Sequence, residues 1–233
     1  MINRILSFII LFVALGATSL KAQVELPFIP NAELIKGTAF VAYPSYSGAP
    51  FLNENFLMGE IQFVDGTKVS NIGLRYSSYR DEVIYYNTYL SVQIVIDNKS
   101  LKGFSFTDEK GVKRTFRHQH YDDNVTSERY FEVLSDGKIA LLAFRKVDLE
   151  PCDPSYDKHG LAYKKSYYYY MYADGRGYSP LNPNRNSLLT KLDKPNQKLA
   201  KRILRKNRVV LTDETSLVLA WNILKENGVT INF

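Results

Sequence analysis

Three Asp-Gly pairs punctuate this chain, and each stands between runs of residues that favour β-strands. The pairs are Asp65-Gly66 in QFVDGTKV, Asp136-Gly137 in VLSDGKIA and Asp174-Gly175 in MYADGRGY. Asp-Gly supplies the positive φ angles that a two-residue hairpin turn requires. A fourth, weaker turn is expected around Gly111 in DEKGVKR. These turns predict neighbouring strands that run antiparallel.

The runs between the turns are short and rich in β-branched, aromatic and aliphatic residues. The strands that they predict are Phe40–Tyr43, Glu60–Val64, Ile72–Tyr76, Val83–Tyr86, Val92–Ile96, Arg129–Leu134, Lys138–Phe144 and Tyr163–Tyr172. No helical periodicity separates them, so they favour an antiparallel β-meander. The segment 151–160 carries two prolines and Cys152 and is expected to connect two strands of the sheet.

After about residue 185, helical signals replace the strand signals. Asn186 or Ser187 can cap a first short helix. Lys194-Pro195 is expected to interrupt it, and Asn196 to cap a second helix in QKLAKRILRKN.

A third helix is predicted to begin near Thr212 or Asp213 and to end at Asn227-Gly228, a pair that tolerates the left-handed conformation. Four of its apolar residues have the i, i+3, i+4, i+7 spacing of one buried face: they are Leu217, Ala220, Trp221 and Leu224. The tail VTINF could return as a short strand. The predicted fold is mainly β (α+β), an antiparallel meander over residues 23–185 with two or three helices in residues 186–233 packed on the same domain.

The N-terminus has the order of a secretory signal peptide, which we predict over residues 1–22. Arg4 precedes an apolar run from Ile5 to Leu15, and small or polar residues follow up to Ala22. That run is too short to span a bilayer. We expect cleavage after Ala22 and no transmembrane segment in the mature chain, because no later stretch is apolar enough.

Charge and cysteine content indicate where in the cell the mature protein is located. Loss of Arg4 and Lys21 with the leader lowers the formal charge from +6 to +4. Cys152 is the only cysteine, so no internal disulfide can form. Export without disulfides fits a bacterial envelope, and we expect a periplasmic or outer-membrane-associated protein. Export also argues against nucleic acid as a partner.

The segment KKSYYYYMY places five tyrosines within seven residues. On a strand, Tyr168, Tyr170 and Tyr172 share one face, and Tyr167 and Tyr169 share the other. The row of three could stack on the sugar rings of a glycan. The favoured alternative is structural: one row enters the core and the other packs beside cross-strand aromatic residues.

The segment RHQHYDD holds two of the three histidines. If it is a strand, His118 and His120 project from one face, and Asp122 could add a carboxylate to form a divalent metal site. A polar loop or an exposed hairpin end explains the segment equally well. No cofactor is predicted.

The segment Lys191–Arg208 is strongly basic, with eight cations against Asp193 alone. Its net charge of +7 leaves about −3 for the rest of the mature chain. Such a helix can meet an anionic lipid surface. The candidate contacts are Lys198, Lys201, Arg202 and Arg205. The favoured alternative is a solvated helix face whose apolar side docks on the sheet, through Leu199, Ile203 and Leu204.

Enzyme signatures are absent from the sequence: it has no G-x-S-x-G, no H-E-x-x-H, no phosphate-binding P-loop and no dinucleotide fingerprint. No catalytic residue is predicted. The expected function is that of a non-catalytic envelope module that binds another protein, a glycan or an anionic lipid surface. The alternative is an envelope hydrolase or a metal-dependent enzyme.

Two stretches, Gly48–Tyr86 and Tyr130–Leu142, resemble a family of exported Bacteroidota proteins. Its members share Gly-x-Pro-[Phe/Tyr]-Leu, Leu-Arg-Tyr followed by Asp-Glu, and Tyr-Phe-Glu-x-Leu-x-Asp-Gly-Lys. Ser77 stands here where asparagine is commoner in the family. The resemblance implies strands and turns but no activity, cofactor or catalytic residue. Within the second motif, Arg75 is expected to pair with Asp81 or Glu82 and so to fix a hairpin.

Overall fold

The computed structural model describes Ile29 and residues 32–121 and 128–231. The strands are β1 (Gly37–Ala39), β2 (Leu57–Phe63), β3 (Lys68–Ser77), β4 (Glu82–Asn87), β5 (Val92–Ile96), β6 (Leu101–Thr107), β7 (Lys113–His120), β8 (Glu128–Ser135), β9 (Ala140–Pro151), β10 (Leu161–Ala173) and β11 (Gly177–Leu181). Two single-turn 3-10 helices are η1 (Ala32–Leu34) and η2 (Asn98–Ser100), and the α-helices are α2 (Arg185–Thr190), α3 (Lys194–Lys206) and α4 (Glu214–Glu226).

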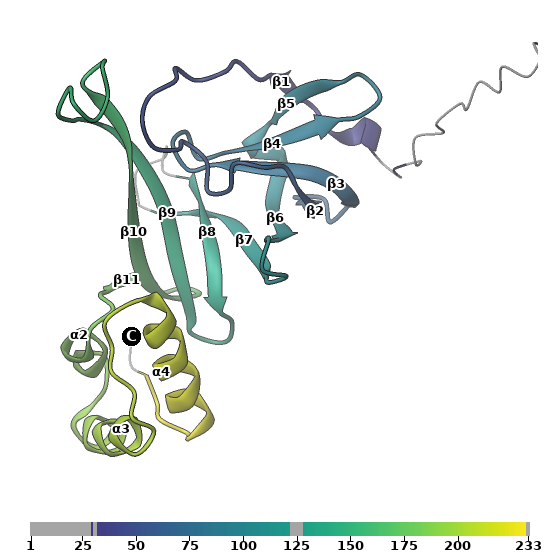
Figure 1. Cartoon of the computed structure of the whole chain (residues 1–233). Coiled ribbons are helices and arrows are strands. Elements are labelled where there is room, and N and C mark those ends of the chain that lie inside the picture. Colours follow the sequence, from purple (N-terminus) through teal and green to yellow (C-terminus); the bar gives the residue numbers. More distant parts are fainter. Residues whose placement is uncertain (1–28, 30–31, 122–127, 232–233) are drawn as a thin grey trace, which may run out of the picture.

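All eleven strands form one open antiparallel sheet, in the order β1-β5-β4-β3-β2-β6-β7-β8-β9-β10-β11 (Figure 1). Each strand pairs with the one before it in sequence, except that β6 returns beside β2 and β1 lies beyond β5. The two edges are short, since β1 has three residues and β11 has five. The mainly β fold with C-terminal helices is therefore confirmed.

The predicted turns are in place, but their geometry differs from the expected two-residue type. At Asp65-Gly66 the Phe63 N–H donates to the Thr67 carbonyl (2.9 Å), which leaves three residues in the loop. Only the glycine has a positive φ, of 92°. Gly111, with φ of 78°, closes β6 and β7 in the same way. A type I turn followed by one left-handed residue needs glycine at a single position, so aspartate need not adopt a positive φ.

One predicted strand is wrong and others were missed. Phe40–Tyr43 is not a strand, because the chain leaves the sheet after the Phe40 N–H donates to the Gln93 carbonyl (2.9 Å). The rings of Phe40 and Tyr43 then pack edge to face, with centroids 5.2 Å apart. This aromatic run covers the sheet instead of extending it. The strands β1, β6, β7 and β11 lie outside the predicted strands, although a strand is one of the alternatives given above for residues 117–120 of β7.

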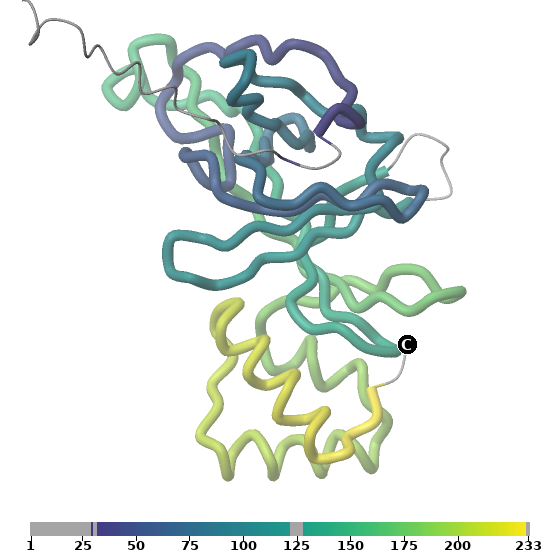
Figure 2. Tube along the Cα trace, turned by 90° about the vertical axis from the view of Figure 1, so that its right-hand side faces the viewer, coloured from purple at the N-terminus to yellow at the C-terminus, as the bar shows by residue number. Residues whose placement is uncertain are grey.

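Two hydrophobic cores lie on one face of the sheet, at its two ends. The first is aromatic and is built around Tyr76, Phe116 and Tyr130, all 1% exposed or less. In the second, the sheet residues Leu141 and Met171 pack with the three helices. Figures 1 and 2 show that the helices gather at the end of β8–β11 that lies away from β1–β5.

The helix starts differ from the predicted ones. Asn184 caps α2, and Asp193 caps α3 by accepting a hydrogen bond from the Asn196 N–H (2.8 Å). Asn186 or Ser187, and Asn196, were therefore wrong as caps. α2 already ends at Thr190, before Lys194-Pro195, and Pro195 lies in the first turn of α3, where an N–H would have no partner within the helix.

The third helix follows its prediction. Asp213 caps α4 in a capping box with Ser216, and the four residues with the spacing of one face are all buried. The helix ends at Asn227, followed by Gly228 with φ of 70°. The tail does not return as a strand over residues 229–231.

Candidate functional site

The exposed cations of α3 and its C-terminal turn form a surface that we call the basic tip. Its members are Lys194, Lys198, Lys201, Arg202, Arg205, Lys206 and Arg208. Ala200, Ile203 and Leu204 are buried on the opposite side of the helix. The four residues predicted to contact an anionic surface therefore point into solvent. They are Lys198, Lys201, Arg202 and Arg205, and they border a shallow hollow of about 480 Å³.

No side chain of the basic tip lies within 4.0 Å of a carboxylate among the described residues. Lysines elsewhere do pair, as Lys164 does with Glu150 at 2.8 Å. Asp193, the acidic residue of this segment, accepts a backbone hydrogen bond as the helix cap. The positive charge of the tip is thus not balanced locally.

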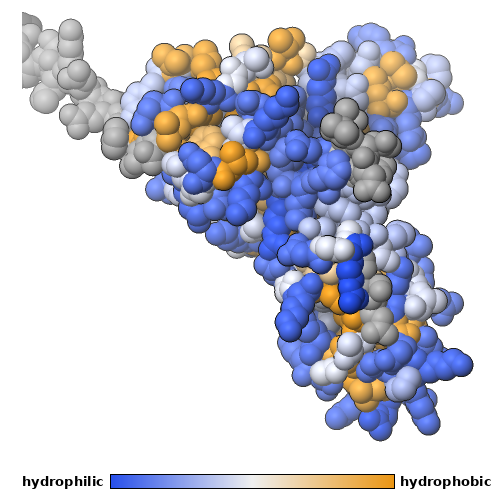
Figure 3. Space-filling model, turned by 180° about the vertical axis from the view of Figure 1, so that it is seen from behind, coloured by the Kyte–Doolittle hydropathy of each residue, from blue (hydrophilic) through white to orange (hydrophobic). Residues whose placement is uncertain are grey.

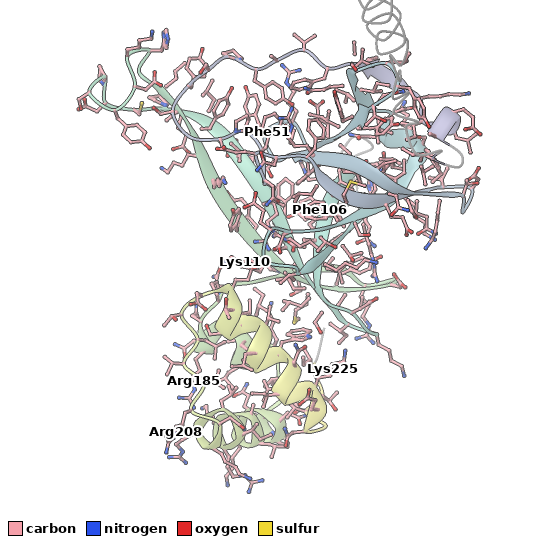
Figure 4. All side chains as sticks on the ribbon, turned by 45° about the vertical axis from the view of Figure 1, so that its right-hand side comes forward. Phe51, Phe106, Lys110, Arg185, Arg208 and Lys225 are labelled. Atoms are coloured by element: carbon pink, nitrogen blue, oxygen red, sulfur yellow. The ribbon has the colours of Figure 1, made fainter. Side chains whose placement is uncertain are left out.

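The helix docks differently from the expectation. α3 packs mainly against α2 and α4, and α4 contacts β8. Ile203 and Leu204 join the same hydrophobic core as Trp221 of α4. The helix is therefore held at a distance from the sheet, and Figure 4 shows it at the extreme end of the molecule, near the labelled Arg208.

The tyrosine row shares one face of β10, as alternation requires, on the side opposite the helices. Tyr170 and Tyr172 are half-buried and contact Tyr178, with ring centroids 6.1 Å and 4.8 Å apart. The Tyr121 hydroxyl donates to that of Tyr170 (3.1 Å). Tyr168 is 45% exposed. Its ring stacks on that of Phe144, with centroids 6.4 Å apart, so all three rings pack with neighbouring rings, as the structural alternative expects.

The two histidines project from one face of β7. The His118 ring stacks on Tyr130, with centroids 4.5 Å apart, and its Nδ1 lies 3.2 Å from the Leu101 carbonyl oxygen. Burial lowers the pKa of His118. His120 is exposed. Asp122, the third candidate ligand, lies outside the described residues, and in the described part of the chain no three His, Cys, Asp or Glu side chains form a metal-binding cluster.

The expected pair between Arg75 and Asp81 or Glu82 does not form. The carboxylate of Asp81 accepts a hydrogen bond from the Tyr76 hydroxyl (2.5 Å), and Glu82 accepts one from Tyr43. Tyr76 and Arg75 are adjacent in β3 and so point to opposite faces of the sheet. The side chain of Asp81 lies on the core face of the sheet with Tyr76, whereas that of Arg75 lies on the opposite face.

Asp81 is a strained turn residue whose carboxylate enters the core. Its φ is 55°, and its carboxylate lies against Tyr76 and Tyr130, which are 1% and 0% exposed. The Tyr130 N–H donates to it at 3.3 Å. Burial raises the pKa of Asp81 to about 6, although these hydrogen bonds act in the opposite direction.

We expect Asp81→Asn to raise the free energy of unfolding at neutral pH. The folded-state pKa of about 6 exceeds the ordinary value of 3.8, so the stability that Asp81 contributes is present at acid pH and is lost as pH rises through 6. The amide removes this loss, about 3 kcal/mol, and tolerates the left-handed backbone. Urea titrations at about pH 7.5 and pH 4 should show the gain only at the higher pH. Asp65→Asn, in an exposed turn, is the control, and a destabilised Asp81→Asn at neutral pH would contradict the argument.

Sequence reasoning missed a buried charge network between the two cores. Arg145 (1% exposed) donates from Nε to Glu132 (5% exposed) at 2.6 Å, and from its terminal nitrogens to Glu214, at the start of α4. Arg114 Nε also donates to Glu132, at 2.6 Å. The available signal was a charged residue inside each of two apolar runs, YFEVL and ALLAFRKV.

The network favours the charged forms of Arg145 and Glu214. Burial alone would lower the pKa of Arg145. The hydrogen bonds and charges of Glu214 and Glu132 raise it by a larger amount, so the pKa of Arg145 lies above its ordinary value. Burial alone would raise the pKa of Glu214. Hydrogen bonds and charges, chiefly those of Arg145, lower it by a larger amount, so the pKa of Glu214 lies below its ordinary value. The network therefore ties α4 to strands β8 and β9.

The predicted leader, residues 1–22, lies outside the described residues. Among the residues that the structure describes, no helix has the length and apolar character needed to cross a bilayer. Comparisons with protein-family models, with curated proteins and with solved structures find no match to this chain.

Proposed function

We propose that the protein is an exported, non-catalytic envelope protein that attaches to an anionic lipid surface through its basic tip. The observation that carries this proposal is the set of seven exposed cations along α3 and its C-terminal turn, none paired with a carboxylate within the described residues. Each lysine or arginine near an anionic membrane contributes about 1 kcal/mol. Several acting together give reversible, salt-sensitive attachment.

The position of the tip supports contact with a flat surface. Figures 1 and 3 place the helical end away from the bulk of the sheet, and Figure 3 shows hydrophilic side chains projecting there. Val210, beside the tip, is 71% exposed and can add a small apolar contact. The helix can therefore reach a membrane plane without obstruction by the sheet.

The expected export supports the same assignment. The N-terminal leader pattern and the resemblance to exported Bacteroidota proteins both favour a periplasmic or outer-membrane location, where phospholipid surfaces are abundant. A glycan bound to the tyrosine row has less support, because Tyr170 and Tyr172 pack against Tyr178.

Vesicle co-sedimentation tests the proposal. Replacement of Lys198, Lys201, Arg202 and Arg205 by glutamine should weaken binding to phosphatidylglycerol-containing vesicles by about tenfold or more, because about four phosphate contacts are lost. Added salt should weaken the wild-type protein in the same way. The matched control replaces four exposed lysines away from α3 by glutamine and should bind as wild type does: Lys99 in η2, Lys110 and Lys158 in turns, and Lys165 on β10.

Three results would refute this function. They are equal loss in the two quadruple variants, wild-type binding in the α3 variant, and equal binding to vesicles of phosphatidylcholine alone. Both variants are expected to fold, because the replaced side chains are exposed. Circular dichroism checks this.

A further inference from the structure

A second hollow of the described surface lies between the segment 39–51 and the sheet. Its volume is about 660 Å³, within the range of small-molecule sites. The wall includes several rings and prolines from the covering segment, Tyr163 of β10, and Arg75 and Gln93 of the sheet. It is mostly apolar, with one cationic group.

Arg75 is that group, and aromatic rings surround it. Its guanidinium carbon lies 4.0 Å from the ring centroid of Phe51 and 4.5 Å from that of Phe56. The terminal nitrogens donate to two uncharged oxygens, those of the Gln93 side chain (2.9 Å) and the Glu54 backbone (3.3 Å). The Arg75 Nε is buried and has no hydrogen-bond partner among the described residues.

In the described part of the chain, Arg75 lacks the carboxylate partner that the covered Arg114 and Arg145 have, as the half-buried Arg129 also does. Arg114 and Arg145 each contact a carboxylate at 2.5 Å, whereas Arg75 has none within 4.0 Å among the described residues. Burial lowers the pKa of Arg75, in keeping with a cation that lacks an anionic partner. A partly buried, unbalanced guanidinium with unused N–H groups is suited to an anion from outside the chain.

We propose that this hollow binds a small organic carboxylate with a ring-shaped body. The planar guanidinium of Arg75 would take the carboxylate, since its N–H fork matches the two oxygens. The ring would lie among the aromatic side chains of the covering segment, such as Tyr43 and Phe51. Acidic sugars and aromatic acids both have this chemistry.

Binding of matched probes to the whole protein tests the assignment. Benzoate should bind about tenfold more tightly than benzyl alcohol, and it should shift the NMR signal of the Arg75 Nε–H group. Glucuronate, compared with glucose, separates an acidic sugar from an aromatic acid. Preference for either carboxylate over its neutral partner supports the site.

Variants locate the effect. Arg75→Gln should reduce the affinity for the carboxylate to that for the neutral probe, and Arg75→Lys, which keeps the charge but loses the fork, should be intermediate. Arg80→Gln removes an exposed charge nearby and should bind as wild type does. If Arg75→Gln does not fold, the comparison of probes on the wild-type protein still decides. The proposal is overturned by equal affinity for charged and neutral probes, by unchanged affinity in a folded Arg75→Gln, or by sulfate that displaces benzoate as well as benzoate itself does.

Discussion

Arg145→Met is expected to lower the free energy of unfolding by about 3–5 kcal/mol, the cost of removing one partner from a buried ion network. Glu132, 5% exposed, would keep only Arg114, and Glu214 would lose its hydrogen bonds to the sheet. The start of α4 would then no longer be held against β9. Urea denaturation followed by circular dichroism measures the change.

The double variant Glu132→Met with Arg145→Met is the decisive control. It removes one charge of each sign, and the remaining Arg114 and Glu214 have side chains 18% and 30% exposed, so water can reach both. We therefore expect the double variant to be more stable than Arg145→Met alone. A double variant as unstable as the sum of the single changes would show that packing, and not charge pairing, sets the stability here.

Trp221→Ala is expected to lower the free energy of unfolding by about 3–5 kcal/mol. Trp221 is 1% exposed and lies in the core that α2, α3 and α4 share with Leu141 and Met171 of the sheet. Truncation leaves a cavity among helices that have few other contacts with the strands. Thermal and urea unfolding, monitored by circular dichroism, measure the loss.

Trp221→Phe separates cavity formation from hydrogen bonding. The indole Nε1 is buried without a partner among the described residues, so phenylalanine gives up no hydrogen bond. We expect this variant to cost less than about 1.5 kcal/mol. A loss below about 1 kcal/mol in Trp221→Ala would mean that the helices do not depend on this core.

Local signals predicted the fold well. The glycine turns, the strand Val92–Ile96 and the cap at Asp213 each depend on residues close in sequence. Phe40–Tyr43 was misassigned because aromatic residues favour strands and covering segments alike. The return of β6 beside β2 depends on contacts between distant residues, which one sequence does not reveal.

The candidate sites divide in the same way. The basic tip could be predicted because its charges lie on one helix with a strong apolar side. The Arg75 hollow could not, since its wall comes from the covering segment and from strands far apart in sequence. The expected pairing of Arg75 with Asp81 or Glu82 was wrong because Asp81 lies on the opposite face of the sheet and Glu82 accepts a hydrogen bond from Tyr43.

The short edges of the sheet have a consequence for behaviour at high concentration. An open sheet can recruit strands from other molecules and grow into fibres through unpaired backbone groups at its borders. β1 presents only three residues for such templating, and β11 includes Pro180, which has no N–H to donate. A broad, aromatic-rich sheet is thereby protected from edge-to-edge polymerisation.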